Sequence, residues 1–187
     1  MNQAEKAIGL IELSSVAAGF LVADSMLKAA NVKLYLSRSI CSGKYMIVVG
    51  GTVSDVEAAV QTGLTAAPDS IIDYLVLPNV HDAVFPALGQ SVALSNDSPG
   101  AMGVVETFSA TSALAAADAA AKAANVTLFR IHLAMALGGK GIVLMTGTVA
   151  DVQAGNQAAA QAARERGLLV SEVVINRPSR ELFEDYL

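Results

Sequence analysis

The chain has 187 residues, of which 53% are hydrophobic and only 16% are charged, so the composition predicts a large core and extensive contacts between subunits. The net charge of −5 lacks the basic surplus that binding to a phosphate backbone requires, which excludes nucleic acid as an expected partner. Charged residues interrupt every long apolar stretch, so none reaches the roughly 18 residues of a membrane helix, and no membrane partner is expected.

The first predicted elements are a buried strand and an amphipathic helix. Residues 7–13, with the sequence AIGLIEL, form a short apolar run that is typical of a buried strand. Ser14 or Ser15 is predicted to cap the following helix, and Asn31 to end it in a left-handed conformation. The predicted apolar stripe of this helix consists of Val16, Phe20, Ala23, Leu27 and Ala30.

Two strands, a second helix and a fourth strand follow. Residues 32–37 alternate between apolar and polar side chains, and residues 45–49 form another apolar run, so both segments are predicted to be strands. Ser54 and Glu57 are predicted to form a capping box at the start of the second helix. Residues 71–77 are the predicted fourth strand, which completes the order β-α-β-β-α-β.

The same pattern recurs in the second half, because the chain is a tandem duplication. Residues 7–41 match residues 101–135, and 12 of these 35 positions are identical. Residues 43–58 match residues 139–154, and 8 of these 16 positions are identical. The slip in register between the two matches gives the second copy two extra residues between its second and third predicted strands.

Each copy is predicted to form one domain. Residues 95–100 are turn formers and are the predicted linker, which places the domains at residues 1–95 and 96–187. The element order in each copy predicts an α/β fold of the α+β, ferredoxin-like type. We therefore expect two four-stranded antiparallel sheets, each with helices on one face.

The sequence offers no recognisable catalytic set. His81 and His132 lie in different copies, and neither accompanies a nucleophile motif, so both are interpreted as surface or interface residues. Glu12 and Glu106 occupy equivalent positions in the two copies, which favours a role in the fold or in an interface over a single active site. The chain is therefore not predicted to be an enzyme.

The single cysteine, Cys41, excludes an intrachain disulfide and favours a reducing cytoplasm. A lone cysteine is commonly a small buried hydrophobic residue. Cys41, however, belongs to the predicted loop Ser-Ile-Cys-Ser-Gly-Lys, and the second copy has Met135 at the matching position. An iron–sulfur cluster needs three or four thiolates, so Cys41 can bind one only where a symmetry axis brings several chains together.

Several segments together resemble the shell domain of bacterial microcompartments, the BMC domain. They are AIGLIEL at residues 7–13, ADSMLKAANV at 23–32, the Gly-Lys turn at 43–44 and GTVSDVEAA at 51–59, with their counterparts in the second copy. Two such domains without circular permutation are similar to the tandem-domain shell proteins, which form trimers with a six-fold-like, pseudohexameric outline. Residues 39–44 further resemble the pore loop of the iron–sulfur shell proteins of propanediol-utilising compartments.

This resemblance implies a homotrimer in the shell of a bacterial microcompartment in the cytoplasm. It implies that Cys41 of three chains holds one [4Fe-4S] cluster at the threefold pore, with the backbone N–H groups of Ser42 and Gly43 near the sulfides. At Ser42 the sequence departs from the family, in which proline commonly follows the cysteine. A flavin or iron–sulfur oxidoreductase in the lumen is the implied electron-transfer partner. The implied edge residues that contact other shell proteins are Lys28, Lys122 and Arg177.

Two other functions stay open from the sequence. A plain trimeric shell tile would use its pore for metabolites and would carry Cys41 as a passive lining residue. A cytosolic ligand-binding regulatory protein would share the ferredoxin-like strand order. The formation of protein sheets separates a shell tile from a dispersed regulatory oligomer.

Overall fold

The computed structural model of the chain describes residues 6–92, 94 and 100–184. The chain divides into two compact units, one up to Val80 and one from His81 onward. The predicted linker lies outside the described residues except for Gly100. Among the described residues, every helix is too short or too polar to cross a bilayer.

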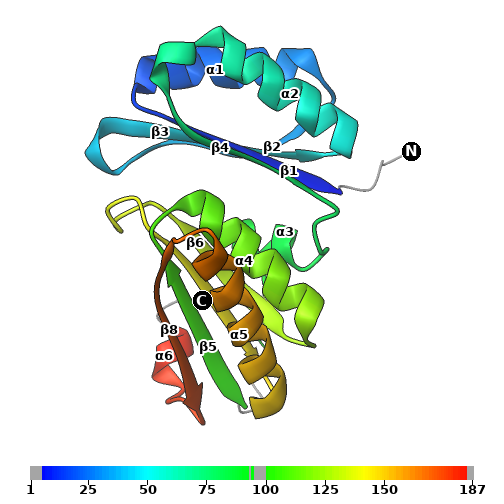
Figure 1. Ribbon diagram of the computed structural model, residues 1–187, viewed down its shortest axis with the longest axis vertical. Helices are drawn as coiled ribbons and strands as arrows, with labels where there is room; N and C mark the ends of the chain where they lie inside the picture. Colours follow the sequence, from blue (N-terminus) through cyan, green and yellow to red (C-terminus); the bar gives the residue numbers. More distant parts are fainter. Residues whose placement is uncertain (1–5, 93, 95–99, 185–187) are drawn as a thin grey trace. The chain divides into compact units, whose positions relative to one another are not determined.

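The first unit has the predicted element order. Its strands form one antiparallel sheet in the order β2-β3-β1-β4, and both helices cover the same face of that sheet (Figure 1). This order and the single helical layer confirm the ferredoxin-like prediction. The elements are β1 (Ala7–Leu13), α1 (Val16–Ala29), β2 (Lys33–Ile40), β3 (Lys44–Gly51), α2 (Val53–Ala66) and β4 (Ile71–Pro78), with short 3-10 turns at Cys41–Gly43 and Pro68–Ser70.

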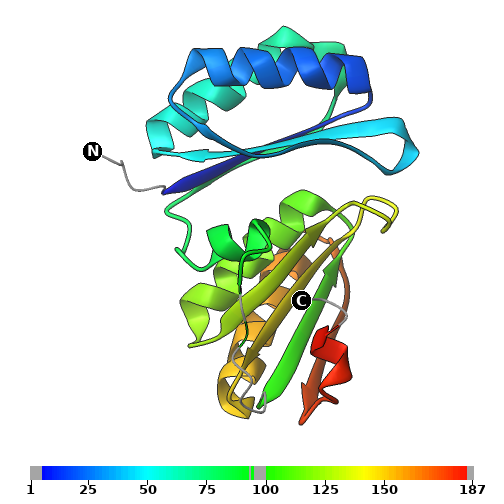
Figure 2. The ribbon, with the colours of Figure 1, turned by 180° about the vertical axis from the view of Figure 1, so that it is seen from behind.

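The second unit repeats this arrangement and adds two short helices. Its sheet has the order β6-β7-β5-β8, with α4 and α5 on one face. The last helix lies on the opposite face of the sheet (Figure 2), where Phe183 packs against Met102, Phe129 and Leu144. The elements are α3 (Val84–Leu88), β5 (Ala101–Thr107), α4 (Ala110–Ala123), β6 (Thr127–Leu133), β7 (Gly141–Gly147), α5 (Val149–Glu165), β8 (Leu169–Asn176) and α6 (Glu181–Glu184).

The buried face of α1 differs from the predicted apolar stripe. Phe20, which the stripe placed in the core, is 64% exposed, and Leu27 is also exposed. The cause is Gly19, since a Cβ there would lie 2.3 Å from the ring of Tyr45. The close approach that this glycine permits sets which face of the helix packs on the sheet. The buried residues of α1 are Gly19, Val22, Ala23 and Met26.

Two predicted helix boundaries were wrong, and one was confirmed. Ser15 caps α1 by accepting the backbone N–H of Ala18. Asn31 does not end this helix in a left-handed conformation, because the helix stops at Ala29 and the chain turns at once into the extended backbone that leads to β2. The second helix is capped by Thr52 rather than by the predicted Ser54.

The caps of α2 and α5 follow one local pattern. The Thr52 hydroxyl accepts the backbone N–H of Asp55 at 3.2 Å and donates to its carboxylate at 2.6 Å. Thr148 and Asp151 make the same two hydrogen bonds in the second unit. The aspartate in the first helical turn also opposes the positive end of the helix dipole. The helix is therefore capped by the Thr-Val-x-Asp sequence. The Ser54–Glu57 capping box, which would start the helix two residues later, does not form.

The close approach at Gly19 gives a stability prediction. We expect Gly19→Ala to lower the free energy of unfolding by about 1–3 kcal/mol, because the added methyl group collides with a buried ring whose hydroxyl is held at 2.9 Å from Ser37 Oγ. The control is Gln61→Ala on the exposed side of α2, which should change it by less than about 0.5 kcal/mol. Urea denaturation measures both, and equal stability of both variants would contradict the packing account.

Candidate functional site

Cys41 lies at the tip of the β2–β3 hairpin. The antiparallel register of the two strands closes with the pair Ile40–Lys44, which leaves Cys41, Ser42 and Gly43 as the connecting turn. The thiol-bearing residue is half-buried, and the two residues after it are exposed. Figure 1 shows this hairpin extending past the end of the first sheet. The fold therefore presents Cys41 at a protruding tip rather than in the core.

Ser42 has a backbone conformation that proline, the residue that the resemblance implies here, cannot adopt. Ser42 has φ 64° and ψ 28°, and Gly43 has φ 72°, so both are left-handed. Proline is restricted to φ near −65°, so it does not fit this backbone at position 42. A Cβ built on Gly43 would meet no atom of the described chain within 4 Å. The turn therefore suits serine and glycine rather than proline, and the space beside Gly43 can accommodate a neighbouring molecule.

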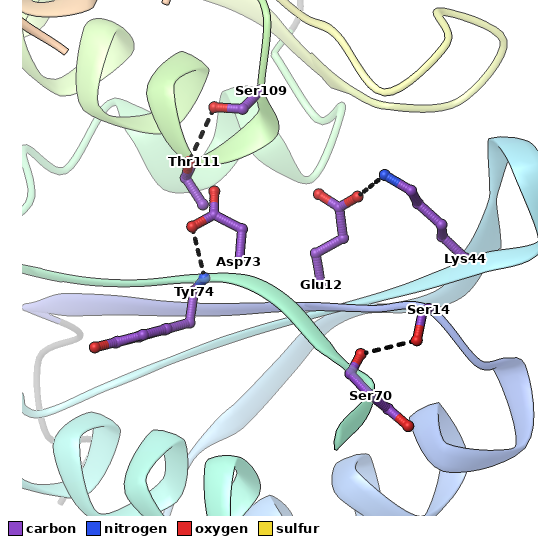
Figure 3. A network of polar contacts seen from close by, with 8 residues as sticks. All are labelled: Glu12, Ser14, Lys44, Ser70, Asp73, Tyr74, Ser109 and Thr111. Carbon is purple, nitrogen blue, oxygen red and sulfur yellow. Dashed lines mark hydrogen bonds and ion pairs between the residues drawn. The ribbon is translucent and has the colours of Figure 1, made fainter. Parts of the chain in front are cut away.

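An ion pair with a buried carboxylate holds the base of the same hairpin. Lys44 Nζ lies 2.8 Å from Glu12 Oε1 on β1, and the Glu12 side chain is only 6% exposed (Figure 3). The second unit repeats the contact, with 2.7 Å between Lys140 Nζ and Glu106 Oε1. Both pairs join the end of the first strand to the residue that follows the loop. Glu12 and Glu106 thus serve the fold, and they fix where each loop leaves the sheet.

The sequence contained the signal for these pairs. Glu12 and Lys44 are each repeated in the second copy, although the chain is poor in charge. Two opposite charges that recur together in both copies of a duplicated chain are candidates for a structural pair. The prediction had treated Lys44 only as part of a Gly-Lys turn.

The corresponding loop of the second unit has a different construction. It is longer and carries left-handed residues at Ala134, Ala136, Gly138 and Gly139. His132 Nε2 lies 2.7 Å from the carbonyl oxygen of Met135, so this histidine fastens the start of the loop. The two loops of one chain are therefore not equivalent, as the sequence predicted.

One chain supplies a single thiolate ligand at this site. In the described residues, no group of three or more His, Cys, Asp or Glu side chains is placed to bind a metal ion. The turn brings Cys41 together with the backbone of Ser42 and Gly43, and no second cysteine exists in the sequence. The donor set of one chain thus fits one third of a three-thiolate cluster site, with backbone N–H groups nearby.

Two ionisable groups outside the turn have shifted pKa values. Burial lowers the pKa of Arg38, which lies opposite Met46 on the hairpin. A guanidinium stays protonated at neutral pH, so the hairpin keeps a permanent positive charge. In the C-terminal segment, a hydrogen bond from the Ser179 hydroxyl is the main cause that lowers the pKa of Glu181.

The residues expected at the edges lie on exposed surfaces. Lys28 is 75% exposed and pairs with Asp24 at 2.7 Å, one helical turn away. Lys122 pairs with Asp118 at 2.6 Å in the same order, so both copies carry the same ion pair one helical turn apart. The edge arginine of the sequence prediction, Arg177, is exposed and follows β8 directly.

The ion pair at the hairpin base gives a second stability prediction. We expect Glu12→Gln to lower the free energy of unfolding by about 1–2 kcal/mol, because it removes a buried charge partner of Lys44. The exposed carboxylate of Glu57 on α2 is the control, and Glu57→Gln should change stability by less than about 0.5 kcal/mol. Thermal unfolding at pH 7 compares the two, and the account is wrong if Glu12→Gln is as stable as the wild type.

Comparisons with known proteins match both units. The BMC domain model matches residues 7–80 and 101–178. The chain is 45% identical over 178 residues to the bacterial microcompartment shell protein PduT of Citrobacter freundii, which covers 95% of this chain and 96% of that protein. It is 39% identical over 91 residues to the shell protein PduA of the same organism, which covers 48% of this chain and 98% of PduA.

A solved structure shows the same architecture over the whole chain. The crystal structure of a microcompartment protein from Desulfitobacterium hafniense DCB has a TM-score of 0.92 and 42% sequence identity. The match covers 97% of this chain and 99% of that chain. The two matched segments, the full-length relative and this structure agree with the two ferredoxin-like units described above. The chain therefore belongs to the BMC domain family, as a tandem-domain bacterial microcompartment shell protein.

Proposed function

We propose that this shell protein is a trimeric tile whose central pore holds one [4Fe-4S] cluster through Cys41 of three chains. Two BMC domains per chain support the trimer, because three chains then supply six similar domains around one axis. The single observation that carries the cluster is Cys41, at a protruding hairpin tip in one copy of the repeat only. In such a trimer, the Cys41 loops of the three first domains and the three different loops of the second domains would face the axis.

The residues of the turn have separate roles in this proposal. Cys41 is the ligand, and three thiolates leave one iron without a protein cysteine. The backbone N–H groups of Ser42 and Gly43 are the donors next to the sulfides. Lys44, tied to Glu12, fixes where the turn leaves the sheet. When bound, a [4Fe-4S] cluster supplies a one-electron carrier, which supports electron transfer or cluster exchange across the shell.

The surroundings of such a tile follow from the same proposal. Neighbouring shell proteins contact the edges at Lys28, Lys122 and Arg177. The electron partner is a flavin or iron–sulfur oxidoreductase in the lumen. The role is structural and electron-carrying rather than enzymatic, in line with the shell proteins to which the chain is similar.

A plain tile with a metabolite pore is the second candidate. The left-handed Ser42 favours it, because the turn differs at this position from the proline-containing turn of the iron–sulfur members. Family membership favours either tile over a ligand-binding regulatory protein.

Metal content decides between the two tiles. After anaerobic purification, the proposal expects about four iron atoms and about four acid-labile sulfides per three chains. Negligible iron in the anaerobic protein would refute the cluster and would leave the plain tile as the function.

A further inference from the structure

The chain carries two equivalent segments, each after the fourth strand of its sheet. Asn79 after β4 and Arg177 after β8 have left-handed φ values of 52° and 51°, which fixes the register between the two segments. Two residues further on, His81 corresponds to Ser179. Phe85 of the first segment and Phe183 of the second are both buried.

The first of these segments is docked within the second unit. The backbone N–H of His81 donates to Asp118 Oδ1 at 2.8 Å, and the Asp118 side chain is only 8% exposed. The helix that follows, α3, packs against β6 and α4 (Figure 1), and Val84 is fully buried. Asp118, one helical turn before Lys122 on α4, is therefore the hydrogen-bond acceptor for this segment.

The residues equivalent to the two sides of this contact, on the C-terminal segment and on α1, are exposed to solvent. On the second segment, Leu182 is the equivalent of Val84, and it is 44% exposed although Phe183 beside it is buried on its own sheet. On α1, Asp24 is the equivalent of Asp118, and its side chain is 58% exposed. Phe20 is the equivalent of Leu114, which is fully buried in α4. Within the described residues, the C-terminal segment is thus a donor without an acceptor surface. The surface of α1 around Asp24 and Phe20 is, in the same residues, an acceptor without a donor segment.

We propose that the C-terminal segment of one chain, residues 178–183, docks on α1 of the next copy. In this contact Asp24 accepts the backbone N–H of Ser179, and Leu182 is covered by the face of α1 that contains Phe20. The segment is already positioned for this, because Phe183 anchors α6 to its own sheet while Leu182 stays 44% exposed. Figure 2 shows α6 against that sheet.

The contact has a direction, and this determines the assembly. One chain contributes its last segment and the next contributes its first helix, so the interface is head-to-tail and closes a ring when the rotation permits. The inference rests on the proposed trimeric tile, for which it names the contact between chains.

The test uses two variants that block opposite sides of this contact. Leu182→Asp blocks the donor segment, and Phe20→Asp blocks the acceptor helix. Both side chains are exposed in the chain, so both variants should keep the circular dichroism spectrum of the wild type. Asp24→Ala is a second acceptor variant that spares the packing of Phe20 on the Tyr45 ring. The control is Tyr74→Glu, since Tyr74 is also exposed and the second copy has Glu172 at the equivalent position.

Light scattering after size exclusion gives the outcome. We expect loss of the trimer in Leu182→Asp, Phe20→Asp and Asp24→Ala at a concentration at which wild type and Tyr74→Glu are fully trimeric. A mixture of Leu182→Asp with Phe20→Asp should form a one-to-one dimer, because each still has one working side. A trimeric wild type with trimeric Leu182→Asp and Phe20→Asp variants would overturn this inference alone. A monomeric wild type would overturn the proposed tile itself.

Discussion

Replacing Cys41 by serine is expected to remove all iron and acid-labile sulfide from the anaerobically purified protein. Cys41 is the only thiol of the chain, so the proposed trimer would lose all three of its soft ligands at once. The fold should survive the change, because the half-buried residue lies in the hairpin turn rather than in the core. Iron and sulfide analysis, together with the visible absorption of the cluster, measures the loss.

The second copy offers a matched control for this experiment. Met135 lies in the corresponding loop and is exposed, so Met135→Ser changes the other set of pore loops without touching a proposed ligand. This variant should keep the iron content of the wild type. The cluster assignment fails if Cys41→Ser retains iron, or if both variants lose it equally.

Removal of both edge lysines is expected to abolish the ordered sheets that a shell tile forms. In the proposed tile, Lys28→Ala combined with Lys122→Ala would remove a repeated contact from every edge. Because many weak contacts would act together, the yield of sheets should fall at least about tenfold. Alanine is preferable to aspartate here. An aspartate at position 122 would stand one turn from the carboxylate of Asp118, which is 8% exposed, and would destabilise the second unit.

The control for the edge experiment removes two cations elsewhere. Lys33→Ala combined with Arg166→Ala changes the net charge by the same amount at exposed positions on β2 and at the end of α5. Negative-stain electron microscopy compares the two double variants after light scattering has shown that both keep the wild-type oligomer. Normal sheets from the Lys28 and Lys122 variant would contradict the edge assignment.

The fold was predictable because two independent patterns agreed. The alternation of residues 32–37 and the apolar run at residues 7–13 define strands, and the duplication repeats the whole order. The face of α1 was not predictable from its apolar residues. Gly19 decides which side meets Tyr45, and a large residue such as Phe20 stays outside in the single chain.

The site was predictable in part. The turn at Cys41 follows from the loop sequence, and its protruding position follows from the hairpin register. The left-handed backbone at Ser42 was missed, because serine has no strong preference for that conformation. In the proposed cluster the remaining ligands would belong to other chains, so one sequence would contain only a third of them.

Native mass spectrometry of the anaerobically purified protein tests the central claim most directly. The account predicts one dominant species with the mass of three 19.1 kDa chains plus a single [4Fe-4S] cluster, and the same trimer without that added mass for Cys41→Ser. A wild-type trimer that never carries the added mass, or a cluster that stays with single chains, would contradict it.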